Sequence, residues 1–292
     1  MERVAELPRT DVPALTAALV TVTLWASAFV GIRSAGHALS PGALALGRLL
    51  VGSAVLGVIA AFRREPLPAP RDLGSIAAVG LLWLGIYNVT LNEAERRVDA
   101  GTAAMLVNLG PILIAVLAGF LLREGFPRKL LTGCVIAFAG SAVIALATSE
   151  RGTRAGWGAL LCIVAAFAYA GGVVAQKPVL RRASAFQVTW LACTIAAFAC
   201  LPFAPTLGHE LTHANASAIA WTAYLGAFPT AIGFVTWAFA LSRTTAGRMG
   251  STTYLVPPIA IVLGWALLGE TPPWLAVAGG AVCLGGVMLA RR

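Results

Sequence analysis

The chain has 292 residues, of which 59% are hydrophobic and only 11% are charged. Soluble domains carry about 25% charged residues, so this composition excludes a soluble globular protein. The formal net charge of +9 does not call for a nucleic-acid partner, because basic residues near membrane headgroups account for it. We therefore predict an all-α polytopic membrane protein, because helices satisfy their own backbone hydrogen bonds in lipid.

Ten apolar stretches follow one another along the chain, each near the length of about 20 residues that crosses a bilayer as a helix. The predicted spans are residues 14–32, 42–62, 73–91, 101–122, 129–147, 157–176, 186–204, 218–240, 249–268 and 274–290. The connections between them are short and leave no room for a soluble domain. We therefore expect membrane lipids to surround nearly the whole chain.

The basic residues predict how these spans are oriented. If the N-terminus is cytoplasmic, 15 of the 21 Lys and Arg residues lie in cytoplasmic segments and 5 lie in external segments. The positive-inside rule then places both termini in the cytoplasm, and high Ala, Gly and Arg usage indicates the inner (plasma) membrane of a bacterium. Arg48 alone lies within a span, about 9 Å from its start at Gly42. We expect Arg48 to reach the outer headgroups as an anchor.

An internal repeat divides the chain. A shift of 146 residues places "LLREGFP" (residues 121–127) on "LLGETPP" (residues 267–273). The same shift pairs Pro111 with Pro257 and Glu124 with Glu270. We therefore predict four parts: a tail at 1–13, a first five-helix half at 14–148, a linker at 149–156 and a second five-helix half at 157–292.

An odd number of spans per half requires the two halves to insert in opposite orientations. The charges of the repeated motif agree with this inversion. Arg123, Arg128 and Lys129 surround the first copy, which is predicted to be cytoplasmic, whereas the external copy "LGETPPWL" carries no base. Inverted repeats build transporters whose halves rock about a site near the bilayer midplane. The sequence thus predicts two inverted-topology repeats around a central cavity.

These features together resemble the drug/metabolite transporter superfamily, EamA type, and within it the YddG-type amino-acid exporters. The resemblance rests on ten spans in a five-plus-five repeat, the opening "LWASAFVGIR", and a proline in spans four and nine followed by a glutamate at each span's end. It implies a basket of helices one, three, four, six, eight and nine around the cavity, with helices two, five, seven and ten outside. It also implies alternating access.

Polar and aromatic residues on the expected lining helices are the candidates for substrate binding. They are Trp83, Tyr87, Asn88, Asn108, Tyr169, Trp237, Ser251 and Tyr254, with Asn92 as a further polar residue of span three. Asn108 and Tyr254 are equivalent under the repeat, which favours a position near the centre. Aromatic faces suit apolar side chains and ammonium groups. The alternative roles are hydrogen bonding between helices and aromatic belts at the membrane surface.

Prolines and glutamates recur at matching positions of the two halves. Pro111 and Pro257 each remove a backbone donor and expose carbonyls, which predicts a kink in spans four and nine. Glu124 and Glu270 stand at the ends of the same spans, where they are candidates for gating ion pairs. Pairing with nearby bases at the helix ends is the alternative.

The distribution of ionisable groups constrains the energetics. The sequence places each of the twelve acids in a tail, a loop or the end turn of a span, and the three histidines in loops. Proton-driven transporters usually carry an ionisable group at depth. We therefore predict uncoupled, gradient-driven transport of a neutral or zwitterionic solute.

Small residues form one face of spans five and ten. Gly133, Ala137 and Gly140 share a face in one helix, as do Gly279, Cys283 and Gly286 in the other. Small faces let helices approach closely in lipid, which predicts tight helix packing, with a dimer face as the alternative.

The stretch "GHELTH" (residues 208–213) has the H-E-x-x-H spacing of zinc proteases, with His209 and His213 as ligands and Glu210 as general base. It lies in a short predicted external loop with no surrounding domain and no evident third ligand. We therefore expect no enzyme activity, no metal and no cofactor.

The predicted function is export of small neutral or zwitterionic metabolites, amino acids including aromatic ones, by alternating access. A transporter of lipid-linked or sugar metabolites is the alternative, and an intramembrane zinc hydrolase is a remote one. The sequence leaves the oligomeric state open and is compatible with a monomer.

Overall fold

The structure is a computed structural model, and it describes residues 11–36, 38–94, 97, 106–148, 155–268 and 273–291. Within these residues the chain forms helices and turns and no strand. The helices are α1 (Val12–Gly36), α2 (Pro41–Arg63), α3 (Pro70–Ala78), η1 (Val79–Ile86), α4 (Tyr87–Ala94), α6 (Gly110–Leu121), α7 (Arg128–Thr148), α8 (Ala155–Val179), α9 (Ala185–Ala199), η2 (Leu201–Phe203), α10 (Ala204–His213), α11 (Ala216–Leu225), η3 (Gly226–Ile232), α12 (Gly233–Ser242), α13 (Ala246–Thr252), η4 (Thr253–Leu255), α14 (Val256–Leu268) and α15 (Trp274–Arg291).

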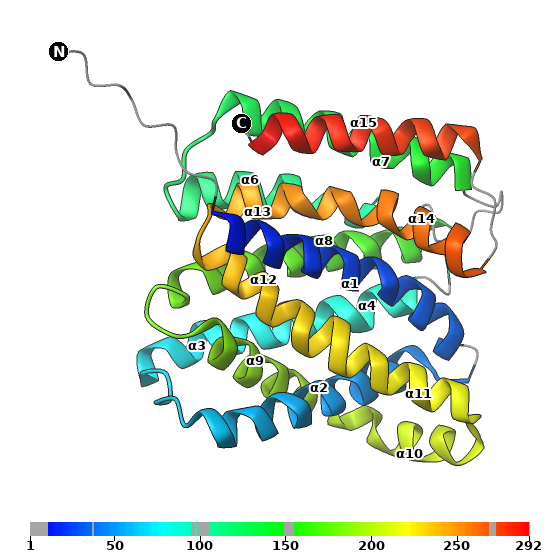
Figure 1. The fold of residues 1–292 in the computed structure, drawn as a ribbon. Coiled ribbons are helices and arrows are strands. Elements are labelled where there is room, and N and C mark those ends of the chain that lie inside the picture. The colour runs from blue at the N-terminus through cyan, green and yellow to red at the C-terminus, as the bar shows by residue number, and fades with distance from the viewer. Residues whose placement is uncertain are drawn as a thin grey trace.

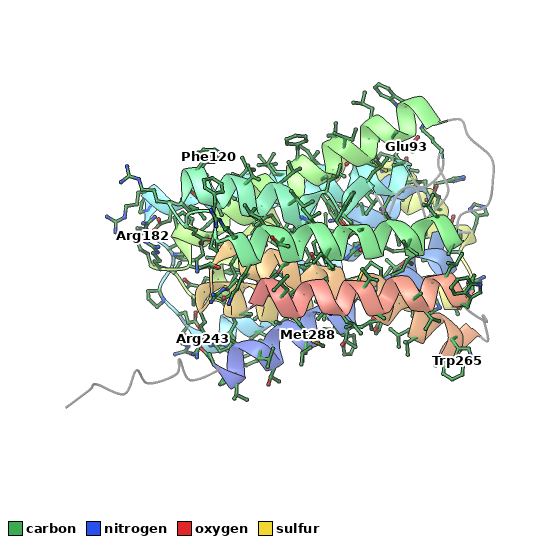
Figure 2. All side chains as sticks on the ribbon, turned by 90° about the horizontal axis from the view of Figure 1, so that it is seen from above. Glu93, Phe120, Arg182, Arg243, Trp265 and Met288 are labelled. Carbon is green, nitrogen blue, oxygen red and sulfur yellow. The ribbon has the colours of Figure 1, made fainter. Side chains whose placement is uncertain are left out.

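Most helices run along one common direction and stack in layers, with α7 and α15 at one edge and α2 with α10 at the other (Figure 1). Arg182 and Arg243 lie at one end of this bundle, and Glu93 and Trp265 lie at the opposite end (Figure 2). We call these the Arg182 end and the Glu93 end.

Length and hydropathy identify the segments that can cross a bilayer. Five continuous helical segments of the described chain are long and apolar enough: Val12–Gly36, Pro41–Arg63, Pro70–Ala94, Trp157–Val179 and Ala216–Ser242. A sixth forms if Ala185–Ala199 and Leu201–His213, which meet at a bend of 51°, are counted as one span. Gly110–Leu121 and Trp274–Ala290 are shorter apolar helices.

The small faces of α7 and α15 pack directly against each other. A Cβ at Gly140 would lie 2.6 Å from the Gly279 carbonyl oxygen, and one at Gly133 would lie 2.6 Å from that of Gly286. Residue numbers run in opposite directions along this contact, so the helices are antiparallel. Each glycine also contacts the repeat equivalent of the other, which is the contact pattern of a two-fold axis perpendicular to the helices.

Two segments of π-helix interrupt the spans that contain Trp83 and Pro229. They are η1 and η3, and the shift of 146 residues maps residues 79–86 onto 225–232, so the two segments are equivalent under the repeat. π-Helical turns are rare and often occur at functional sites, because they redirect side chains and free backbone carbonyls. The Pro229 carbonyl, for example, accepts a hydrogen bond from Trp25 Nε1 at 3.2 Å.

The prediction of a loop around residues 205–213 is wrong. These residues form helix α10, which is polar except for buried Leu207 and lies along the Glu93 end (Figure 1). His209 and His213 therefore lie on a helix and not in a loop. The spacing of Pro202, Leu207 and Leu211 was too sparse to predict an amphipathic helix of only ten residues.

Candidate functional site

A cavity of about 130 Å³ lies between the helices, in the half of the bundle nearer the Glu93 end. Six of the residues singled out in the sequence line it: Trp83, Tyr87, Asn88, Asn108, Tyr169 and Pro257. Asn92 lines it as well, and its amide donates to the Pro41 carbonyl at 3.1 Å. The volume is close to that of an apolar cavity of ~150 Å³ that holds benzene, so it is the space of one small molecule.

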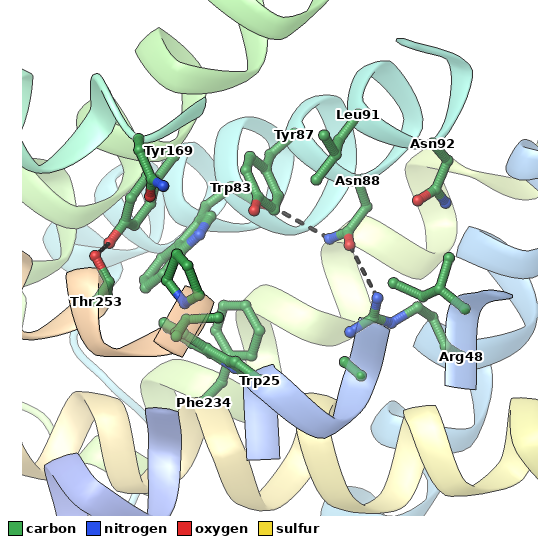
Figure 3. A pocket seen from close by; sticks show the side chains of 15 residues that line it. Trp25, Arg48, Trp83, Tyr87, Asn88, Leu91, Asn92, Tyr169, Phe234 and Thr253 are labelled. Carbon is green, nitrogen blue, oxygen red and sulfur yellow. Dashed lines mark hydrogen bonds between the residues drawn. The ribbon is translucent and has the colours of Figure 1, made fainter. Parts of the chain in front are cut away.

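Aromatic rings close the cavity toward the Arg182 end (Figure 3). The Trp25 ring lies 5.8 Å from Trp83 and 5.2 Å from Phe234, measured between centroids, and Tyr169 lies 5.2 Å from Trp83. We call Trp25, Trp83, Tyr169 and Phe234 the aromatic floor. The sequence analysis did not single out Trp25 or Phe234.

Trp237 lies beneath this floor and does not line the cavity. Its ring stacks on Trp25 with 5.1 Å between centroids, one helical turn closer to the Arg182 end than Phe234. It is 0% exposed, and its Nε1 has no hydrogen-bond partner among the described residues. A buried donor without a partner costs about 1–3 kcal/mol, so it is an unusual feature beside a cavity.

Ser251 and Tyr254 are buried behind the cavity wall. The Ser251 hydroxyl donates to the Arg248 carbonyl of its own helix at 2.8 Å. The Tyr254 hydroxyl donates to the Asn108 carbonyl at 2.9 Å, so these two repeat-equivalent residues contact each other. The neighbouring Thr253 does line the cavity, and it accepts a hydrogen bond from the Tyr169 hydroxyl at 3.3 Å.

The placement of Arg48 corrects the sequence analysis. It is 6% exposed, it lines the cavity, and it does not reach the headgroups. Helix α2, expected outside the basket, buries a face of small residues and leucines from Gly42 to Leu49 against its neighbours. The cavity is therefore not free of charge, as predicted, but contains one buried cation.

Both prolines of the repeat lie in the first turn of a helix. Pro111 follows Gly110 at the start of α6, just after a turn at residues 108–109. Pro257 is the second residue of α14, which follows the 3-10 turn η4. Proline is well tolerated there, because the first N–H groups of a helix have no partner within it.

Polar contacts between the two halves gather at the Arg182 end. The Glu124 carboxylate accepts hydrogen bonds from the backbone N–H groups of Ala246 at 2.8 Å and Gly247 at 3.2 Å. The Lys177 ammonium donates to the carbonyls of Leu241 and Thr244. Asp72 is buried and binds Arg182, whose pKa this hydrogen bond raises. With the aromatic floor, these contacts close that end.

Glu270 lies outside the described residues, so its role in gating stays a prediction.

Glu210 has a structural partner that the zinc motif does not predict. Its carboxylate accepts a hydrogen bond from the Ser40 backbone N–H at 2.7 Å, at the start of α2. His213 Nδ1 lies 3.0 Å from the His209 carbonyl, and within the described residues no group of three His, Cys, Asp or Glu side chains is placed to hold a metal ion. The motif therefore holds α10 against the start of α2.

This placement gives a first prediction. Glu210→Ala should lower the melting temperature by roughly 2–4 °C, because a lost helix-capping bond costs about 1 kcal/mol. His209→Ala should leave both melting temperature and transport unchanged, because this side chain is exposed. Thermal unfolding of the purified variants, with and without added zinc, measures both. A zinc-dependent stabilisation lost in His209→Ala would contradict this assignment.

The sequence matches a known family over nearly all of its length. Residues 12–146 and residues 156–292 each match the EamA-like transporter family. The chain belongs to this family. Its named relatives are transporters and not enzymes, so it is a transporter.

Three relatives and one solved structure extend the comparison. A protein of Streptantibioticus cattleyicolor named "Probable terminal-alkyne amino-acid exporter" is 38% identical over 96% of this chain and 93% of its own length. An uncharacterized transporter of Bacillus subtilis is 33% identical over 91% and 87%. A "Probable amino-acid metabolite efflux pump" of Salmonella typhimurium is 26% identical over 93% and 92%. A crystal structure at 20% identity superposes with a TM-score of 0.77 over 95% of this chain and 96% of its own, which shows the shared fold.

Proposed function

We propose that this transporter exports small amino acids with apolar side chains by alternating access. The observation that carries the proposal is the cavity, which combines an aromatic floor with a polar wall of Arg48 and Asn88 in a space of about 130 Å³. Amino-acid export is also what the names of two relatives describe. A sugar would need many polar partners, whereas the floor offers aromatic rings.

The proposal includes a topology of ten membrane crossings in two inverted halves, residues 14–148 and 157–292, in the inner membrane. The antiparallel contact of α7 with α15 supports the inversion. The excess of basic residues supports a cytoplasmic Arg182 end with both termini in the cytoplasm. The cavity then faces outward, and the closed end faces the cytoplasm.

We propose that transport is not coupled to protons. Among the described residues that line the cavity there is no Asp, Glu or His, and Arg48 is the one charged group. Arginine stays protonated at physiological pH, so it does not bind and release a proton during a transport cycle. The net direction of transport then follows the gradient of the solute.

Counterflow in proteoliposomes tests this function. Vesicles loaded with unlabelled L-norvaline, L-leucine or L-phenylalanine should accumulate the labelled amino acid transiently, and a pH gradient should leave the rate unchanged. Empty vesicles are the control. Counterflow of sugars in place of amino acids would overturn the substrate class, and counterflow that requires a pH gradient would overturn the uncoupled mechanism.

A further inference from the structure

Arg48 is a buried cation whose hydrogen-bonding capacity is only partly used. Its Nε donates to the Thr230 hydroxyl at 3.0 Å, and its Nη1 donates to Asn88 Oδ1 at 3.2 Å (Figure 3). Both acceptors are neutral. A guanidinium has five N–H groups, so three have no acceptor among the described residues and remain for an occupant of the cavity.

The charge of Arg48 is also uncompensated. Among the described residues no carboxylate forms an ion pair with it, and the ion pairs that do form lie nearer the ends of the bundle. Burying an unpaired ion costs several kcal/mol, and an apolar side chain of similar size fills a wall without this cost. An intramembrane cation in this state indicates a binding site for an anion.

The surrounding helices hold the guanidinium in one orientation. Asn88 Nδ2 donates to the Leu84 carbonyl at 2.9 Å, which turns Oδ1 toward Arg48. Thr230 is 1% exposed and belongs to the π-helical segment η3. Partners from two different spans therefore fix the planar fork, and a fixed fork matches the two oxygens of a carboxylate.

The other wall of the cavity is apolar. Trp25, Trp83 and Phe234 lie across the cavity from Arg48 (Figure 3). None of the described lining residues is an acid, so no counter-charge is present for an ammonium group. The cavity thus offers one strong polar contact, suited to a carboxylate, and a separate apolar surface.

We propose that Arg48 binds the carboxylate of the transported solute, while its apolar chain packs on the aromatic floor and its amine contributes little to affinity. This inference rests on the proposed function, because it takes the solute to occupy this cavity. The substrate class is then small carboxylates with a short apolar chain, with or without an amino group.

Four compounds that differ by single groups test the proposal on the purified wild-type protein. L-norvaline carries both groups, pentanoate lacks the amine, butylamine lacks the carboxylate, and norvaline methyl ester masks it. Titration followed by tryptophan fluorescence reports binding, because Trp25 and Trp83 line the cavity. We expect norvaline and pentanoate to bind with similar affinity. Butylamine and the ester should bind roughly 10- to 100-fold more weakly, the range for losing a charged hydrogen bond.

Two variants locate the effect at Arg48. Arg48→Gln should weaken binding of norvaline and pentanoate by the same factor and leave butylamine unchanged. Asn88→Asp places a carboxylate 3.2 Å from Nη1 in nearly the same shape, so it should pair with Arg48 and displace the ligand. Because this pair neutralises a buried charge, the melting temperature should not fall. Arg181→Gln, an exposed arginine beyond the end of α8, is the matched control.

The outcomes separate this inference from the proposed function. If both variants bind norvaline like the wild type, or if butylamine binds as tightly as pentanoate, Arg48 is not the carboxylate site, although amino-acid transport stands. If pentanoate binds through Arg48 but no amino acid binds or exchanges, the inference stands and the proposed function is wrong.

Discussion

Gly286→Leu should prevent accumulation of folded protein in the membrane, whereas Gly285→Leu, one residue earlier, should not. A Cβ at Gly286 would lie 2.7 Å from the Gly133 carbonyl oxygen and 2.8 Å from the Ala137 Cα. Both atoms belong to the backbone of α7, so relief requires the two helices to separate. A Cβ at Gly285 meets nothing within 4 Å, because this position is exposed on the outer side of α15.

Overpacking usually costs about 1–3 kcal/mol, and a clash with helix backbone lies at or above the upper end. We expect Gly286→Leu to lower the melting temperature by roughly 10 °C or to abolish the folded peak in size-exclusion chromatography. Gly285→Leu should elute and melt like the wild type. Equal behaviour of the two variants would show that the α7–α15 contact is not tight. A wild-type dimer that only Gly286→Leu dissociates would support the dimer alternative.

The repeat was the part of the architecture that the sequence predicted in most detail. Residues 146 positions apart not only match but meet: Tyr254 contacts Asn108, and the Cys283 thiol lies 3.2 Å from the Ala137 carbonyl oxygen. A residue contacts its own equivalent only near a symmetry axis. The offset alone therefore located residues at the centre, but it did not tell which of them line the cavity, because that depends on helix rotation.

Arg48 was misplaced because depth along a helix does not specify which face is buried. Counting residues from Gly42 gave a depth that allows either snorkelling or burial. A signal was present in the flanking sequence "GALALGR" (residues 42–48), whose small residues indicate close helix packing in lipid. Thr222 and Thr230 pack near Gly47 and Gly52 in the structure, which brings α2 into the wall of the cavity.

The π-helical segments were not predicted, because periodicity rules do not distinguish one wide turn within an apolar helix. Gly80 and Gly226, which are 146 residues apart, mark their positions. A Cβ at Gly80 would lie 2.5 Å from the Ala192 carbonyl oxygen, and one at Gly226 would lie 2.7 Å from that of Arg48. A conformational demand at equivalent positions of both halves was therefore visible in the sequence only as two glycines at the repeat offset.

Glu124→Ala should open the end of the molecule that is closed in this structure. The Glu124 carboxylate joins the loop after α6 to the first residues of α13, and thus the first half to the second. Hydrogen bonds to a charged group are each worth about 1.5–3 kcal/mol. Losing this connection should shift the equilibrium toward an Arg182-end-open state by roughly 10- to 100-fold, if the opposite state lacks the contact.

Labelling of a reporter cysteine measures this shift. Gln176 is 1% exposed and lies on α8 between the aromatic floor and the Arg182 end, so Gln176→Cys should react slowly with a membrane-impermeant thiol reagent. The native cysteines are buried and add little background. Glu124→Ala should raise the labelling rate about in proportion to the population of the open state. Glu93→Ala removes an exposed acid at the opposite end, and its rate should equal that of the parent, since exposed pairs contribute little. Identical rates in all three proteins would mean that Glu124 caps α13 without controlling access, and the closure would then depend on Lys177 and the aromatic floor.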